Sequence, residues 1–192
     1  MFKIKQNCPV IWREDRTPEA VQHCRDCGLI EHGSRMIWGE GNPAAPVMIV
    51  LDNPGAREDK EGNPFLCGTR QTLQQAAYEV GFSEHDLYIT YVLKRRPRKA
   101  YNKDHARSVC MQHLLGQLEL QQPRLVFCLG NTAVQHFFHD AAVEVKQLRT
   151  KWHVARQFQT LVSYHPLAVR RRPNLWRLFV ADWMMLAAAY RN

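Results

Sequence analysis

The chain has 192 residues and a formal net charge of +8, and its composition is 45% hydrophobic and 23% charged. These proportions are those of a globular protein and exclude a disordered or low-complexity chain. The apolar runs are too short to cross a bilayer, and the N-terminus lacks the apolar core of a secretory signal. We therefore expect one domain over residues 1–192, a cytoplasmic monomer that does not enter membranes, and a polyanionic partner for the positive charge.

Short apolar segments predict the strands of a buried sheet, and they lie at residues 47–51, 87–92, 125–129 and 160–164. Helical spacing alternates with them at residues 69–80, 104–120, 132–138 and 175–190. We also expect a helix at residues 17–24, begun by Thr17 and Pro18, and Asn131 as the N-cap of the third main helix. This alternation predicts an α/β fold of three layers, with a mostly parallel four-stranded sheet flanked by helices.

Ligands of such sheets bind beyond the carboxyl ends of the strands. This rule nominates four segments, at residues 52–55, 91–96, 130–131 and 165–166. In the first segment, Asp52 and Asn53 precede a sharp Pro-Gly turn whose backbone N–H groups are able to face a ligand. The alternative is that both side chains only bond to their own turn.

Two further residues are candidates for chemistry at this edge. His165 ends a predicted strand and precedes Pro166, so it is placed to donate a hydrogen bond to a developing anion. Phe65 follows Gly62 and Pro64 in a loop, where an aromatic ring is able to stack on a base. The alternatives are a structural histidine and a phenylalanine that fills the core.

Basic residues gather in two clusters, at residues 94–99 and 170–172. One interpretation is two solvated loops. The other is contact with phosphates, each of which releases counterions and makes binding dependent on salt.

The motifs, taken in order, resemble those of the iron–sulfur (family 4) uracil-DNA glycosylases over about residues 24–176. The resemblance implies the fold of that superfamily and a DNA glycosylase that hydrolyses the N-glycosidic bond of uracil or a related deaminated base. DNA is then the partner. The residues that carry the resemblance lie at 38–43, 53–59, 62–65, 88–90, 94, 96–97, 117–120, 123, 129–130 and 164–166.

The resemblance also implies roles by position. His165 stabilises the uracil anion, and Asp52 or Asn53 positions the attacking water. The residues expected to bind the base are Pro54, Gly55, Phe65 and Tyr91. Those expected to contact DNA are Lys94, Arg96, Arg170, Arg171 and Arg172.

Three residues at the ends of predicted strands differ from the family pattern: Asp52, Asn53 and Tyr91. Asp52 replaces Glu, and Asn53 replaces Ala but matches the related mismatch-specific and single-strand-selective glycosylases. Tyr91 replaces the Asn that reads the uracil edge, and a hydroxyl cannot reproduce the paired donor and acceptor of an amide. The alternative function is a catalytically inactive glycosylase-like protein that binds DNA or a partner. The sequence lacks a Walker or Gly-rich dinucleotide fingerprint, so we expect no nucleotide cofactor.

The chain contains six cysteines, and in a cytosolic protein metal ligation and burial explain cysteines better than disulfides do. The resemblance implies a 4Fe-4S cluster, for which Cys24, Cys27 and Cys110 match family ligands, whereas Arg95 replaces the remaining cysteine. His113 offers a Cys₃His set for zinc instead. We predict that a metal centre survives, held by Cys24, Cys27 and Cys110 with His113 or an external ligand.

Overall fold

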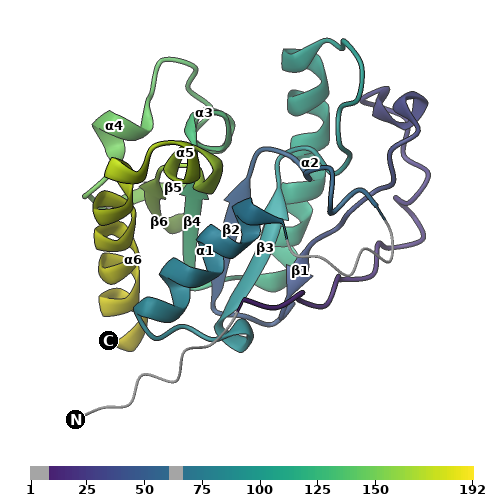
Figure 1. Cartoon of the computed structure of the whole chain (residues 1–192). Helices are drawn as coiled ribbons and strands as arrows, with labels where there is room; N and C mark the ends of the chain where they lie inside the picture. Colours follow the sequence, from purple (N-terminus) through teal and green to yellow (C-terminus); the bar gives the residue numbers. More distant parts are fainter. Residues whose placement is uncertain (1–8, 61–66) are drawn as a thin grey trace.

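The computed structural model describes residues 9–60 and 67–192. Within these residues one mixed sheet has the strand order β1-β3-β2-β4-β6-β5 (Figure 1). The strands are β1 (Glu40–Gly41), β2 (Val47–Leu51), β3 (Leu87–Tyr91), β4 (Leu125–Leu129), β5 (His153–Ala155) and β6 (Phe158–Ser163). The helices are η1 (Leu29–His32), α1 (Gly68–Glu79), η2 (Glu84–Asp86), α2 (Lys103–Gln121), α3 (Asn131–Phe138), α4 (Val145–Leu148), α5 (Pro166–Arg171), η3 (Pro173–Leu175) and α6 (Trp176–Arg191).

The four predicted strands form the parallel centre of the sheet, β3-β2-β4-β6. The expected four-stranded sheet is corrected to six strands, because β1 and β5 add antiparallel edges. Strands β2, β3 and β4 are buried along their whole length, as expected for a sheet covered on both faces.

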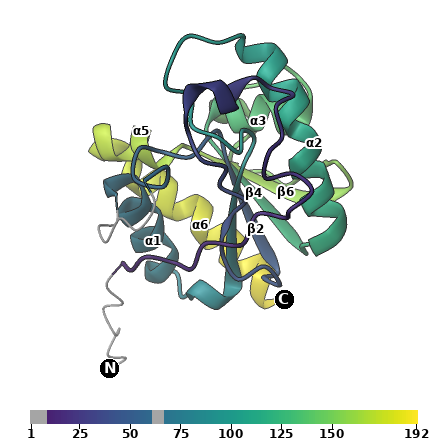
Figure 2. The same ribbon diagram turned by 90° about the vertical axis from the view of Figure 1, so that its right-hand side faces the viewer.

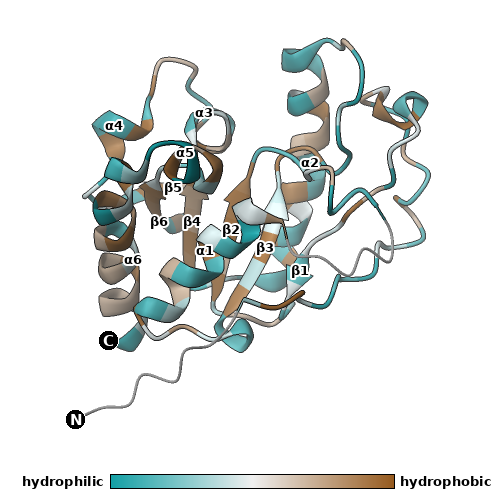
Figure 3. Cartoon of the chain, viewed as in Figure 1, coloured by the Kyte–Doolittle hydropathy of each residue, from teal (hydrophilic) through white to brown (hydrophobic). Residues whose placement is uncertain are grey.

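Helices cover both faces of the sheet and confirm the three-layer architecture. Figure 2 shows α1, α5 and α6 on one side of the strands and α2 and α3 on the other. The first layer packs on alternate strand residues such as Ile49 and Phe127, and the second on their neighbours Met48 and Val126. Figure 3 shows apolar strands enclosed by helices of mixed polarity. None of the helices in the described part of the chain is long and apolar enough to span a membrane.

The prediction of a helix at residues 17–24 was wrong, since this segment forms turns in which Val21 N and Gln22 N both donate to Pro18 O. All of its residues are exposed or half-buried, so no buried apolar face stabilises a short helix. In addition, Gln22 O accepts a hydrogen bond from Arg95 instead of a helical N–H.

The N-cap of α3 is Gly130 rather than Asn131. The Asn131 Oδ1 atom instead accepts from Val145 N, and so joins the first turn of α3 to α4. Gly130 has φ of 96°, and a Cβ atom there would lie 2.8 Å from the Cβ atom of His165. A glycine is therefore required for β4 and the end of β6 to approach each other.

Candidate active site

A cavity of about 550 Å³ lies at the carboxyl ends of β2, β3, β4 and β6. All four segments nominated from the sequence contribute to its wall, the segment at residues 91–96 through Tyr91 alone. This agrees with the rule that parallel sheets bind ligands beyond the carboxyl ends of their strands. The lining residues predicted from the sequence are Asp52, Asn53, Gly55, Tyr91, Gly130, Asn131 and His165. The predicted residue Phe65 lies outside the described residues.

His165 is the N-cap of α5, and its ring is held in one tautomer. The Leu167 N–H donates to His165 Nδ1 over 3.1 Å, so Nδ1 carries no proton. Burial lowers the pKa of His165 to about 4 although the charge of Asp52 opposes this shift, and the ring is therefore neutral near pH 7. Its remaining proton is on Nε2, which leaves a hydrogen-bond donor on the cavity wall.

Asp52 is held by an arginine that the sequence did not nominate. Arg107 Nε and Nη2 each lie 3.1 Å from one oxygen of the Asp52 carboxylate, in a bidentate pair. Burial alone would lower the pKa of Arg107, but the hydrogen bonds and charge of Asp52 raise it. Each carboxylate oxygen keeps a lone pair, so Asp52 is able to accept a hydrogen bond from a water molecule as well.

Asn53 and Pro54 form the turn that follows β2. Asn53 Nδ2 donates to Pro54 O over 2.8 Å, as expected if its amide bonds to its own turn. Pro54 is buried, and Asn53 contributes to the cavity wall. This geometry distinguishes the two candidates for positioning water, because Asn53 uses its amide donor locally whereas Asp52 presents a fixed acceptor.

Tyr91 lines the cavity, but its hydroxyl is already bonded. It donates to Glu40 Oε1 over 2.7 Å and accepts from Arg70 Nη2 over 2.7 Å. Burial raises the pKa of Tyr91 well above its ordinary value, so the hydroxyl keeps its proton. Glu40 and Arg70 were not predicted from the sequence, because a buried ion pair between residues this far apart leaves no local pattern.

The predicted DNA-contacting residues differ in exposure. The prediction for Lys94 was wrong, since this side chain is fully buried and its ammonium bonds to Thr90 Oγ1 and Gln117 Oε1 and lies over the Trp38 ring. Burial lowers the pKa of Lys94 to about 7. Arg96 is partly exposed and lies 3.8 Å from Asp59. The cluster Arg170, Arg171 and Arg172 is exposed, and for these residues DNA contact stays a prediction.

The four predicted metal ligands do not fit a metal site. Cys24 lies 3.4 Å from His113 and Cys27 hydrogen-bonds to Cys110, while the charge of Arg95 interacts with all three thiols. Among the described residues, no group of three or more Cys, His, Asp or Glu side chains converges as a metal site requires. The position of the fourth family cysteine belongs to Arg95, whose guanidinium cannot bind a cation.

Arg95 makes a connection that a metal would otherwise provide. Its guanidinium is buried and donates to Ser34 O over 2.6 Å and to Gln22 O over 2.7 Å. An antiparallel β-bridge between Arg95 and Met36 connects the same two segments through their backbones. The guanidinium therefore links the N-terminal segment to the loop that follows β3.

Comparison with known proteins shows the family of the chain. Residues 38–187 match the Uracil DNA glycosylase superfamily. The chain belongs to this superfamily. It is similar to the type-4 uracil-DNA glycosylase of Pyrobaculum aerophilum, with 31% identity over 87% of this chain and 89% of the relative. The corresponding enzyme of Archaeoglobus fulgidus is 31% identical over 85% of this chain and 86% of the relative, and that of Thermotoga maritima is 29% identical over 85% and 87%.

Proposed function

We propose that the protein is a DNA glycosylase that hydrolyses the N-glycosidic bond of uracil or a related deaminated base. The observation that carries the proposal is the neutral His165, whose Nε2–H donor shares one cavity with the Asp52 carboxylate. Membership of the superfamily and the names of the relatives support the same reaction.

The mechanism follows from what each group offers. The target nucleotide leaves the base stack and enters the cavity. As the bond from the sugar to the base breaks, negative charge develops on the base, and the His165 Nε2–H donates a hydrogen bond to it. Asp52 accepts a proton from the water that attacks the sugar cation, and Arg107 fixes its orientation. The products are the free base and an abasic site.

The partner in this proposal is single- or double-stranded DNA, bound by a monomer. The exposed arginines 170–172 form the C-terminal end of α5, whose N-cap is the catalytic histidine, so they lie on the segment next to the cavity. Phosphates on either side of a flipped nucleotide are the anions closest to such a site.

An excision screen tests the proposal. Oligonucleotides that contain uracil, hypoxanthine, xanthine or unmodified bases are incubated with the protein, as single and double strands, and alkali-labile abasic sites are measured. The proposal expects cleavage at uracil or another deaminated base.

The second candidate is an inactive glycosylase-like protein that binds DNA or a partner. The observation that favours it is the Tyr91 hydroxyl, which stands where the family has an amide that reads the base. This hydroxyl is already hydrogen-bonded to Glu40 and Arg70 and is not free to bond to a base. Binding to DNA without abasic sites in any strand context would support this candidate.

A further inference from the structure

The cavity wall formed by α1 carries a buried guanidinium with unused donors. Arg70 Nη2 donates to both Glu40 Oε1 and Tyr91 Oη, each over 2.7 Å, so both Nη2 hydrogens are used. The side chain is only 3% exposed, and its Nε–H has no hydrogen-bond partner among the described residues. A buried donor without a partner carries a free-energy cost, and Arg70 lines the cavity in which a ligand acceptor would lie next to its guanidinium.

A carboxylate is held beside this guanidinium on the same wall. Glu58 Oε1 lies 3.9 Å from Arg70 Nη2 and accepts a hydrogen bond from Cys67 Sγ over 3.1 Å. The other oxygen lies above Gly55, where an added Cβ atom would come within 2.5 Å of it. The absence of a side chain at Gly55 therefore allows the Glu58 carboxylate to occupy this position.

The two side chains together replace a pattern that Tyr91 cannot provide. The amide side chain of the family presents a donor next to an acceptor. The Tyr91 hydroxyl that replaces it in this chain already forms hydrogen bonds with Glu40 and Arg70. Arg70 supplies donors and Glu58 supplies an acceptor from adjacent positions.

We propose that Arg70 and Glu58 read the edge of the flipped base. Arg70 donates to an exocyclic carbonyl oxygen, and Glu58 accepts from the ring N–H next to it. The inference rests on the proposed function, and it states which base edge the wall accepts: a ring N–H next to a carbonyl oxygen, which uracil shares with thymine and guanine but not with cytosine. Deamination converts an edge with a ring-nitrogen acceptor and an amino donor, as in cytosine, into one with a ring N–H donor and a carbonyl acceptor, as in uracil.

Cytosine meets the opposite pattern at this wall. Its amino group would face the Arg70 donors, and its unprotonated ring nitrogen would face the Glu58 carboxylate. Neither pair forms a hydrogen bond, so cytosine leaves buried polar groups unpaired, and rejection by this mechanism is strong.

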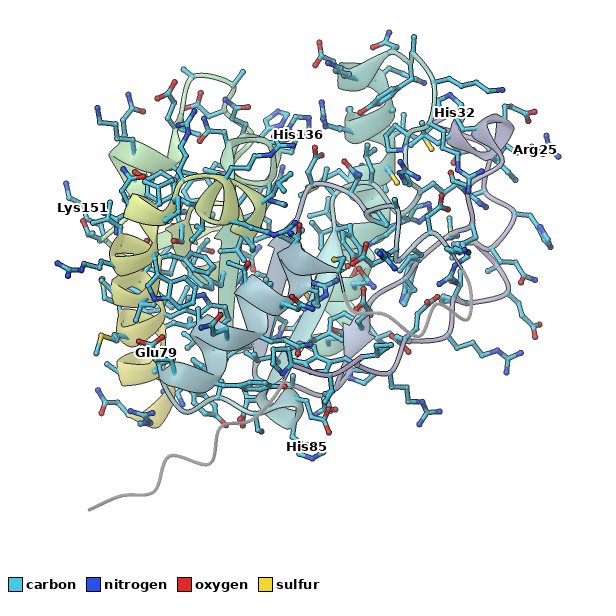
Figure 4. All side chains as sticks on the ribbon, in the orientation of Figure 1. Arg25, His32, Glu79, His85, His136 and Lys151 are labelled. Carbon is cyan, nitrogen blue, oxygen red and sulfur yellow. The ribbon has the colours of Figure 1, made fainter. Side chains whose placement is uncertain are left out.

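The test combines a change in the protein with a change in the base. Excision rates of uracil and N3-methyluracil, which lacks the ring N–H, are compared in the wild type, Glu58→Ala and the matched control Glu79→Ala. Glu79 is an exposed residue at the far end of α1, away from the cavity (Figure 4). Thermal unfolding of all three proteins checks that the changes leave the fold intact.

We expect the wild type and Glu79→Ala to prefer uracil by about 10- to 100-fold, the usual size of one base-edge contact. Glu58→Ala should excise uracil about 10- to 100-fold more slowly and should lose most of that preference, because removing the carboxylate and methylating the ring nitrogen abolish the same hydrogen bond. A Glu58→Ala protein that keeps the full preference for uracil would overturn the inference.

The same design separates this inference from the proposed function. If the wild type excises no base, the proposed function fails, and affinities for oligonucleotides with uracil or N3-methyluracil are compared instead. The inference then expects tighter binding of uracil by the wild type and no difference for Glu58→Ala. Equal affinities for the wild type would refute base reading by this pair.

Discussion

One backbone hydrogen bond sets the chemistry of His165. Because Leu167 N–H donates to Nδ1, the proton of the neutral ring is confined to Nε2. Protonation of Nδ1 would break this bond inside a buried site, and burial has already lowered the pKa to about 4. The residue is therefore suited to donate a hydrogen bond to an anion without first becoming a cation.

We predict that His165→Ala lowers the excision rate by about 10²–10³-fold and leaves DNA affinity nearly unchanged. The pH profile is a second readout. Since the folded pKa lies below the ordinary value, the neutral form persists as pH falls, and the His165 contribution should stay constant down to about pH 5 and be lost near pH 4. A loss of rate in the wild type centred near pH 6.5, absent from His165→Ala, would contradict this assignment.

Asp52 and Asn53 should differ in importance, because Asp52 presents a fixed acceptor and Asn53 donates within its own turn. We predict that Asp52→Asn lowers the single-turnover excision rate by about 10²–10⁴-fold, the range for loss of a general base. Asn53→Ala should be the milder change. The matched control is Asp104→Asn, an exposed residue of α2 near Arg107. A harsher effect of Asn53→Ala would favour the amide mechanism of the related glycosylases.

At the scale of elements, short segments place the catalytic groups. The six-residue helix α5 has His165 as its N-cap and basic residues in its last turn. Likewise, the loop after β3 carries the Arg95 link to the N-terminal segment. These connections suggest one experiment on DNA binding and one on the cysteine site.

Replacing Arg170, Arg171 and Arg172 with Ala should weaken binding to all DNA sequences alike. The slope of log affinity against log salt should become shallower by up to about three phosphate contacts. Titrations at several salt concentrations measure both effects. The control replaces Arg124 and Arg191, exposed cations that bond to backbone at the opposite end of the sheet. Equal slopes for the triple variant and the wild type would leave these arginines as ordinary surface charge.

Arg95 should hold the N-terminal segment without a metal. We predict that protein purified without chelator contains no stoichiometric iron or zinc by elemental analysis. Arg95→Ala should destabilise the fold by about 1–3 kcal/mol, because it leaves the carbonyl of the buried Ser34 unpaired. Arg16→Ala, an exposed change, is the control. One equivalent of zinc, or a brown protein that absorbs near ~400 nm, would restore the four-residue metal prediction.

At the scale of the whole molecule, the sequence predicted the parallel centre of the sheet and the edge that holds the cavity. Continuous apolar runs such as 47–51 and 125–129 are strong signals because both faces of these strands are buried. The edge strands were missed because β1 has two residues and β5 has three, too few to show alternation.

The polar partners of the site were beyond sequence reasoning. Arg107 lies 55 positions from Asp52, and the Tyr91 hydroxyl meets Glu40 across 51 positions. Lys94 lies in a basic run that is typical of an exposed loop, but its ammonium donates hydrogen bonds to Thr90 and Gln117 inside the fold. Such pairs exist only after the chain has folded, so charge patterning along the sequence does not reveal them.

The most direct test of the account measures the two products of hydrolysis together. Purified protein is incubated with an oligonucleotide that contains one uracil, and released uracil and abasic sites are quantified beside the His165→Ala variant. The account predicts equal amounts of free uracil and abasic sites from the wild type and a rate about 10²–10³-fold lower from the variant. Tight binding of this DNA, with no free base released from uracil or any other deaminated base in either strand context, would contradict it.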